Sequence, residues 1–182
     1  MDFINEKVAW ALLRIAMGWI FFWAFIDKLF GLGFHTCVSK DGKFVGMMCD
    51  MASSGGNAAW LSGGNPTFGF LKFGLNPSSP VLNLYHAMAG HPIANWLFML
   101  GLLGIGIALM LGIAVRLASV SGIVMMILMY LGVMLPANNP FLDEHLVYAL
   151  IFLAFAFSTV GETWGMGKWW NENVAVKCKL LK

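Results

Sequence analysis

The sequence predicts an all-α integral membrane protein: a four-transmembrane-helix bundle with a long extracytoplasmic loop between its first two helices. Of its 182 residues, 59% are hydrophobic and 11% are charged, whereas soluble domains carry about 25% charged residues. Residues 93–115 and 117–135 contain no charged side chain, and each is close to the roughly 20 apolar residues that cross a bilayer. Because lipid offers the backbone no hydrogen-bond partner, these stretches are expected to be helices.

The first expected span covers residues 8–30. Its apolar stretch, 15–26, lies between Arg14 and the pair Asp27–Lys28. The leader before it holds two acidic residues against one lysine, and no small-residue cleavage site follows the apolar stretch. We therefore expect a retained helix rather than a cleaved signal peptide.

Residues 31–92 predict a long outer loop that carries short interfacial or re-entrant helices. Three apolar pieces, 60–61, 68–73 and 81–85, are separated by glycines and prolines, which prevent any of them from spanning. Short aromatic-rich pieces of this kind are typical of helices that lie in the membrane interface. We expect this loop to fold as a cap over the outer end of the bundle.

Three more spans are expected at residues 93–114, 117–135 and 143–160. The connection between the first two is so short that these helices must be antiparallel neighbours, and Pro136 ends the second of them. With a mixed tail, 161–182, the chain is predicted to form a single membrane domain. Lysines and arginines favour the side of the two termini, so both termini are expected in the cytoplasm.

Two groups of ionisable residues are expected together at the outer end of the bundle. Asp27 and Lys28 end the first helix, and Asp143, Glu144 and His145 begin the fourth. Lys28 would bind an anion, and Asp27, Glu144 or His145 would transfer protons. Helix capping is the alternative for Lys28, Asp143 and Glu144, because their charges complement the helix ends.

Two arginines are candidates for binding a cofactor. Arg14 lies within the first span, where an arginine by default faces the bundle or a polar cavity. It would anchor a carbonyl-bearing ligand such as a quinone, unless it snorkels to the headgroups or pairs with Glu162. Arg116 lies between the second and third spans, and anchoring by the positive-inside rule is its alternative to ligand contact.

The cysteines predict a disulfide in the outer loop. Cys37 and Cys49 lie in that loop, whereas Cys178 lies in the tail, a distribution that suits an oxidising outside and a reducing inside. A Cys37–Cys49 bond would close a loop of about 13 residues and contribute on the order of 3 kcal/mol. A redox-active thiol pair is the alternative, although such pairs usually have a closer Cys-x-x-Cys spacing.

The sequence gives no signal for a haem, a flavin or a metal. It contains no Cys-x-x-Cys-His and no glycine-rich dinucleotide motif. His86 and His91 are expected to be loop residues, with a metal role as the alternative. The net charge of +2 gives no sign of nucleic-acid binding.

Three stretches of the chain, taken in order, carry a family resemblance. They are Leu12–Gly18 with Asp27–Lys28, Gly101–Ile113 running into Arg116–Ala118, and Asn139–Ala149 leading to Gly161 and Trp164–Gly165. Together they resemble the DoxX/DoxD family of four-helix membrane proteins, which includes the large subunit of thiosulfate:quinone oxidoreductase. The matching family-like positions are Arg14, Asp27, Lys28, Arg116, Asp143, Glu144 and His145.

The resemblance implies a multi-pass protein of a prokaryotic cell membrane that oxidises thiosulfate to tetrathionate on the outer face and passes the electrons to membrane quinone. It also implies a small partner subunit. A groove lined by methionine and aromatic side chains would hold the quinone. Two other functions stay open: a non-catalytic accessory or assembly subunit of a respiratory membrane complex, and a thiol-redox membrane protein.

Overall fold

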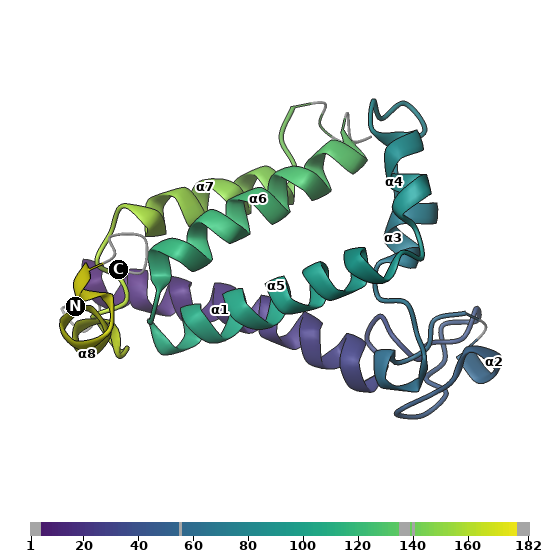
Figure 1. Cartoon of the computed structure of the whole chain (residues 1–182), viewed down its shortest axis with the longest axis horizontal. Helices are drawn as coiled ribbons and strands as arrows, with labels where there is room; N and C mark the ends of the chain where they lie inside the picture. Colours follow the sequence, from purple (N-terminus) through teal and green to yellow (C-terminus); the bar gives the residue numbers. More distant parts are fainter. Residues whose placement is uncertain (1–4, 55, 135–138, 140, 178–182) are drawn as a thin grey trace. The chain divides into compact units, whose positions relative to one another are not determined.

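The computed structural model describes residues 5–54, 56–134, 139 and 141–177, and these residues form helices and turns with one isolated bridge between Val38 and Phe44. The all-α prediction is confirmed for this part of the chain. Figure 1 labels the helices, which are α1 (Glu6–Phe30), α2 (Met51–Ser54), α3 (Phe68–Phe73), α4 (Leu82–Met88), α5 (Pro92–Leu111), α6 (Val115–Val133), α7 (Glu144–Ala156) and α8 (Gly167–Asn173), with 3-10 turns at Trp60–Ser62 and Ala175–Lys177.

Among the described residues, three helices are long and apolar enough to cross a membrane: α1, α5 and α6, with 25, 20 and 19 residues. At about 1.5 Å per residue, each approaches or exceeds the ~30 Å of a hydrocarbon core. These helices indicate a membrane-embedded protein. The fourth expected span corresponds to α7, which is apolar but has 13 residues and so reaches only about 20 Å.

The helix ends differ from the sequence prediction in ways that have local causes. The helix α5 ends at Leu111 rather than at 114 because Gly112 takes a left-handed φ of 72°. The amide of Gly112 bonds to the carbonyl of Leu109, and the amide of Ile113 bonds to that of Ala108, as in glycine-terminated helices. The predicted helix stop at Pro136 lies outside the described residues, as does Cys178.

Contacts divide the chain into two compact units. Unit 1 consists of Met1–Phe22, Leu103–Tyr130 and Asn138–Lys182, and unit 2 consists of Trp23–Leu102 and Leu131–Ala137. The three long helices α1, α5 and α6 each contribute to both units. The single membrane domain expected from the sequence stays a prediction.

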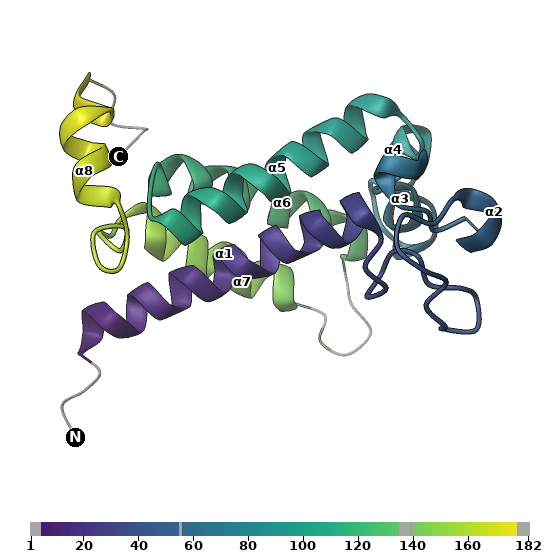
Figure 2. The same cartoon turned by 90° about the horizontal axis from the view of Figure 1, so that it is seen from below.

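In unit 1, glycines bring α1 and α5 into backbone contact. A Cβ atom added to Gly18 would lie 2.8 Å from the amide nitrogen of Met110, and one added to Gly106 would lie 2.7 Å from that of Phe22. Figures 1 and 2 both show these two helices running alongside each other. Small residues of this kind allow close helix packing in membranes, where no hydrophobic force draws helices together.

Aromatic side chains join α7 to the same unit. The rings of Phe21 on α1 and Phe152 on α7 meet edge to face at 5.3 Å between centroids, and those of Trp10 and Phe155 meet at 6.2 Å. A Cβ atom on Gly122 of α6 would lie 2.7 Å from the ring of Phe152. Phe152 therefore packs against both α1 and α6.

In unit 2, hydrogen bonds tie the long loop to the helices that flank it. The Thr67 hydroxyl donates to the Asn95 side-chain oxygen of α5 at 2.7 Å, and both residues are buried. The Ser79 hydroxyl donates to the Leu131 carbonyl of α6 at 2.6 Å. Buried side chains of α3, α4 and α5 form a small core, which consists of Leu71, Tyr85 and Ala94. The second half of the loop is thus folded onto the helices of its own unit.

Candidate functional site

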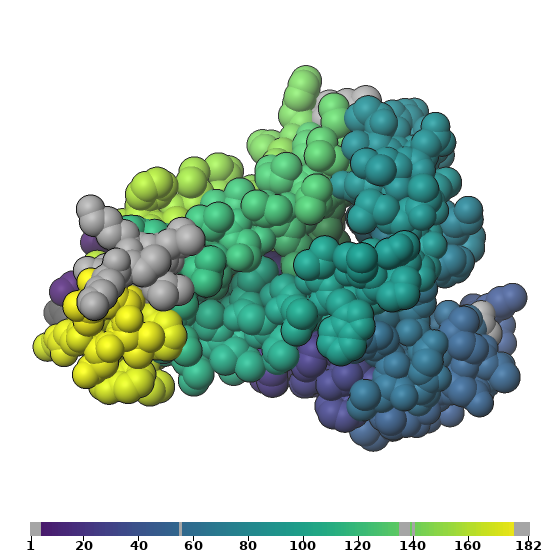
Figure 3. All heavy atoms as spheres, in the orientation of Figure 1, coloured from purple at the N-terminus to yellow at the C-terminus, as the bar shows by residue number. Residues whose placement is uncertain are grey.

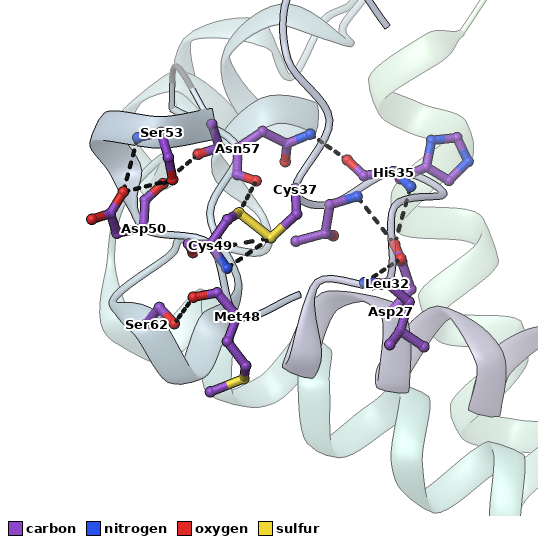
Figure 4. Close-up of a disulfide and its surroundings, with 12 residues drawn as sticks. Asp27, Leu32, His35, Cys37, Met48, Cys49, Asp50, Ser53, Asn57 and Ser62 are labelled. Atoms are coloured by element: carbon purple, nitrogen blue, oxygen red, sulfur yellow. Dashed lines mark hydrogen bonds between the residues drawn. A yellow bond between two sulfur atoms is a disulfide. The ribbon is translucent and has the colours of Figure 1, made fainter. Parts of the chain in front are cut away.

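Asp27 organises the turn that follows α1. Its side chain is 2% exposed, and its two carboxylate oxygens accept four backbone N–H groups. The donors, at 3.1–3.2 Å, are those of Leu32, Phe34, His35 and Thr36. Figure 4 shows the chain curling around this carboxylate. An acidic residue near a helix C-terminus is normally disfavoured, and these donors explain why one is present here.

The four donors also bear on the role predicted for Asp27. The four backbone N–H groups fix this carboxylate in place. Left-handed glycines, Gly31 at φ 68° and Gly33 at φ 88°, let the chain wrap around it. These contacts favour a role in positioning the turn over the predicted role in proton transfer.

The Cys37–Cys49 disulfide lies directly after this turn. The two residues are 0% and 7% exposed. The Cys37 amide donates to the Asn57 carbonyl at 2.8 Å, and the Asn57 side-chain amide donates to the His35 carbonyl. Figure 4 shows that the disulfide, the Asn57 bridge and the Asp27 turn form one connected block.

A pocket of about 650 Å³ lies within unit 2, beside this block. Its basic side chains are Lys28, His35 and Lys40. Its neutral hydrogen-bonding side chains include Thr36, Ser39, Ser54, Asn57 and Asn65, and its apolar wall includes Met51, Phe68, Phe70 and Phe73. None of the described lining residues is acidic, so this pocket, called here the basic pocket, favours an anion.

The second predicted group begins α7. Asp143 is the N-cap residue of this helix: one carboxylate oxygen accepts the Leu146 amide at 3.1 Å, and the other lies 2.7 Å from Nδ1 of His145. Glu144 is exposed in the first turn. The three residues offer ligand atoms within 4.8 Å of one another. The capping alternative is thus observed for Asp143, and His145 is held by its carboxylate.

The structure places the two predicted groups in different units. Asp27 and Lys28 belong to unit 2, and Asp143, Glu144 and His145 belong to unit 1. Within unit 1, the side chains of Asp143 and His145 are in contact. The convergence of the two groups into one site stays a prediction.

Arg14 is fully buried in unit 1 and bonds to the protein backbone. Its Nη1 donates to the carbonyls of Leu109 and Met110, the second at 3.2 Å. Its Nη2 donates to the carbonyls of Thr163 and Trp164 at 3.1 and 3.0 Å. The last carbonyls of a helix have no intrahelical i+4 donor, and the guanidinium supplies donors to two of those of α5. It thereby caps this helix and ties it to α1 and to the segment after α7.

Glycines make room for this guanidinium, which the sequence analysis did not anticipate. A Cβ atom on Gly112 would lie 2.9 Å from Nη1 of Arg14, and one on Gly165 would lie 3.1 Å from Nη2. The signal in the sequence is the single Gly112 after α5 together with Gly161 and Gly165 after α7. The structure shows neither snorkelling of Arg14 to the headgroups nor a pair with Glu162. Instead, the guanidinium is buried and donates to backbone carbonyl groups. These contacts favour a structural role over the predicted quinone anchor.

Arg116 lies in unit 1 at the start of α6. Its Nε donates to the carbonyl of Ala156, the last residue of α7, at 3.1 Å. It also lines a second pocket, of about 590 Å³, in this unit. Arg116 therefore joins the ends of two helices and faces a space that a ligand can fill.

Comparisons of the chain with family models, with curated proteins and with solved structures found no match. The resemblance to the DoxX/DoxD family therefore rests on the sequence stretches named above. The basic pocket has side chains that suit the anionic substrate which that resemblance implies.

Proposed function

We propose that this protein is a DoxX/DoxD-like subunit of a quinone-linked oxidoreductase that oxidises thiosulfate on the outer face of a prokaryotic cell membrane. Two thiosulfate dianions join through a new sulfur–sulfur bond to give tetrathionate and release two electrons. A membrane quinone takes up these electrons with two protons and becomes a quinol. The loop of unit 2 would face outward, with both termini in the cytoplasm.

The proposal includes four spans, with α7 as the fourth. A helix of 13 residues is shorter than the hydrocarbon core, and such a mismatch is relieved by local thinning of the bilayer or by snorkelling of the flanking side chains. The N-cap Asp143 and the exposed Glu144 would lie at the outer interface. Asp143, Glu144 and His145 would transfer protons at that interface.

The basic pocket is the observation that carries the proposal. Its volume of about 650 Å³ lies within the usual range of ligand pockets, about 300–1,000 Å³. Lys28 and Lys40 supply positive charge, and Thr36 and Asn57 supply hydrogen-bonding groups for sulfonate oxygens. The phenylalanines of α3 supply an apolar wall against which a quinone ring can pack.

Positive charge is needed because the proposed reaction brings two dianions together. Two unit charges 4 Å apart repel by about 4 kcal/mol at an effective dielectric constant of about 20, so two dianions repel by about 16 kcal/mol. A pocket with acidic walls would add to this barrier. Lys28 and Lys40, with His35 when it is protonated, oppose the repulsion.

The test is thiosulfate binding and oxidation by the purified full-length chain in proteoliposomes with a short-chain quinone. Calorimetry measures binding, and the absorbance of the quinone measures its reduction. Lys28→Ala should weaken thiosulfate binding at least about tenfold, as expected when a charged contact is lost. Lys72→Ala is the matched control, because Lys72 is exposed on α3 and does not line the basic pocket.

Three results would separate this proposal from its alternatives. Absence of thiosulfate binding, or equal binding by Lys28→Ala and the parent protein, would overturn it. Binding without quinone reduction, even with a partner subunit added, would favour a non-catalytic accessory subunit. A double variant, Cys37→Ser with Cys49→Ser, that keeps its activity per folded molecule would exclude the thiol-redox function.

A further inference from the structure

The second pocket, in unit 1, lies at the junction of two spanning helices. Its walls include Gly112 and Ala114 from the connection between α5 and α6, and Arg116 from the first turn of α6. Both helices are long enough to cross a membrane, and residues 112–114 join them. A connection this short between two spans lies at one surface of the bilayer. The pocket is therefore at the depth of the lipid headgroups.

The walls of this pocket carry charges of both signs. Arg116 and Lys168 are its cations, and Glu162 and Glu172 are its carboxylates. Arg116 is held in place by its bond to the Ala156 carbonyl, whereas the other three side chains are exposed. A ligand that carries a phosphate and an ammonium group matches this arrangement, because each of its charges meets an opposite charge.

Exposed apolar side chains lie in the same segment of the chain as Glu162 and Lys168, which line the pocket. Trp164, Met166 and Trp169 are 59%, 48% and 53% exposed. Figure 3 shows the atoms of this part of the chain, in yellow, at the surface. Exposed tryptophans beside charged residues are typical of the level where headgroups meet acyl chains. The ligand of this pocket is therefore expected to be a lipid.

We propose that the unit 1 pocket binds the headgroup of an aminophospholipid. Arg116 and Lys168 bind the phosphate, and Glu162 and Glu172 accept hydrogen bonds from the ammonium group. The acyl chains leave the pocket along Trp164. The bound lipid joins the segment after α7 to the α5–α6 connection, and this role is independent of thiosulfate oxidation.

The test uses the full-length chain in nanodiscs of defined composition, with lipid binding measured by native mass spectrometry. The probes are phosphatidylethanolamine, phosphatidylcholine and phosphatidylglycerol in turn, each added to a neutral background lipid. Phosphatidylcholine has the same net charge as phosphatidylethanolamine but no N–H donors, and phosphatidylglycerol lacks the amine. Phosphatidylethanolamine should bind about tenfold more tightly than either, as expected for a charge-assisted hydrogen bond.

Variants test which side chains bind the ammonium group and which bind the phosphate. Glu172→Gln should reduce the preference for phosphatidylethanolamine over phosphatidylglycerol, and Lys168→Ala should weaken the binding of both. Lys72→Ala, in unit 2, should bind all three lipids like the parent protein. Equal binding of the three lipids, or unchanged selectivity in Glu172→Gln, would overturn the proposal. Soluble phosphoethanolamine should bind only weakly, and binding as tight as that of the lipid would show that a free metabolite is the ligand.

Discussion

Arg14 and Asp27 lie on the same helix, in different units, and both are buried charges that bond to backbone groups. Arg14 donates to carbonyl groups that lie 95 to 150 residues away in the chain. Asp27 accepts N–H groups from only 5 to 9 residues away. Arg14 therefore joins distant segments of unit 1, whereas Asp27 shapes one local turn of unit 2.

This difference predicts how many segments of each unit lose hydrogen bonds when the charged residue is replaced. Removal of the arginine takes a donor from carbonyls of α5 and of the segment after α7, so several elements of unit 1 lose a shared contact. Removal of the carboxylate frees a turn whose other constraint, the Cys37–Cys49 disulfide, remains. The variants below break these contacts in turn.

The largest effect is expected for Arg14→Met. The methionine fills part of the space but supplies no donor to the carbonyls of Leu109, Met110, Thr163 and Trp164. Removing one side of a buried charged network typically costs about 3–5 kcal/mol. Denaturant unfolding of the protein in mild detergent should show a loss of this size. Arg14→Lys should recover part of it, and a loss below about 1 kcal/mol would contradict the structural role.

Removal of the disulfide should cost somewhat less. The bond closes a loop with a sequence separation of 12, for which chain entropy gives on the order of 3 kcal/mol. Cys37→Ala combined with Cys49→Ala should lower the free energy of unfolding by about this amount. It should also increase hydrogen exchange in residues 37–59, while Cys178→Ala serves as the control. Unchanged exchange there would show that the Asp27 turn holds this region alone.

Asp27→Asn should have a more local effect. The asparagine keeps one acceptor oxygen but turns an NH₂ group towards two of the backbone N–H donors of residues 32–36. A loss of about 2 kcal/mol is expected, since burying unsatisfied donors costs about 1–3 kcal/mol. Hydrogen exchange should rise at residues 32–36 and stay unchanged in α5. Thiosulfate binding should weaken as well, because His35 and Thr36 line the basic pocket.

Local patterns in the sequence predicted the long helices but not their partners. Uncharged apolar stretches gave α5 and α6 to within a few residues, because hydropathy depends on composition over a window of residues. The end of α5 was misplaced because a single left-handed glycine, Gly112, decides it. The acceptors of Arg14 come from distant segments, and the glycines after α5 and α7 indicate that space is kept there without indicating which residue fills it.

The candidate site was predicted only in part for the same reason. Lys28 was identified as a cation at the outer end of the first span, and it lines the basic pocket. His35 and Lys40 were not candidates, because they follow no motif and join Lys28 through the fold of the loop. The useful signal was the pair Gly31 and Gly33 after Asp27, which marks a chain that turns back around the carboxylate.

The smallest effect is expected at an exposed carboxyl group in unit 2. The backbone N–H and the hydroxyl of Ser53 donate to Asp50 at 2.8 and 2.7 Å and hold the pKa of this carboxyl below its ordinary value. Because the pKa is lower in the folded state, these bonds stabilise the fold above the unfolded pKa of about 4. Their contribution is lost as the pH falls through the folded pKa.

Ser53→Ala removes the hydroxyl and keeps the backbone donor, so the pKa of Asp50 should rise part of the way towards its ordinary value. An NMR titration of the Asp50 carboxyl carbon measures this shift, with Ser78→Ala as a control at a serine that has no contact with Asp50. The loss of stability should appear near neutral pH, where the carboxyl is ionised and the Ser53 contacts contribute, and it should be small because the group is exposed. An unchanged titration of Asp50 would contradict the hydroxyl contact. A loss in the free energy of unfolding at neutral pH as large as that of Asp27→Asn would contradict the contrast between buried and exposed carboxylates in this unit.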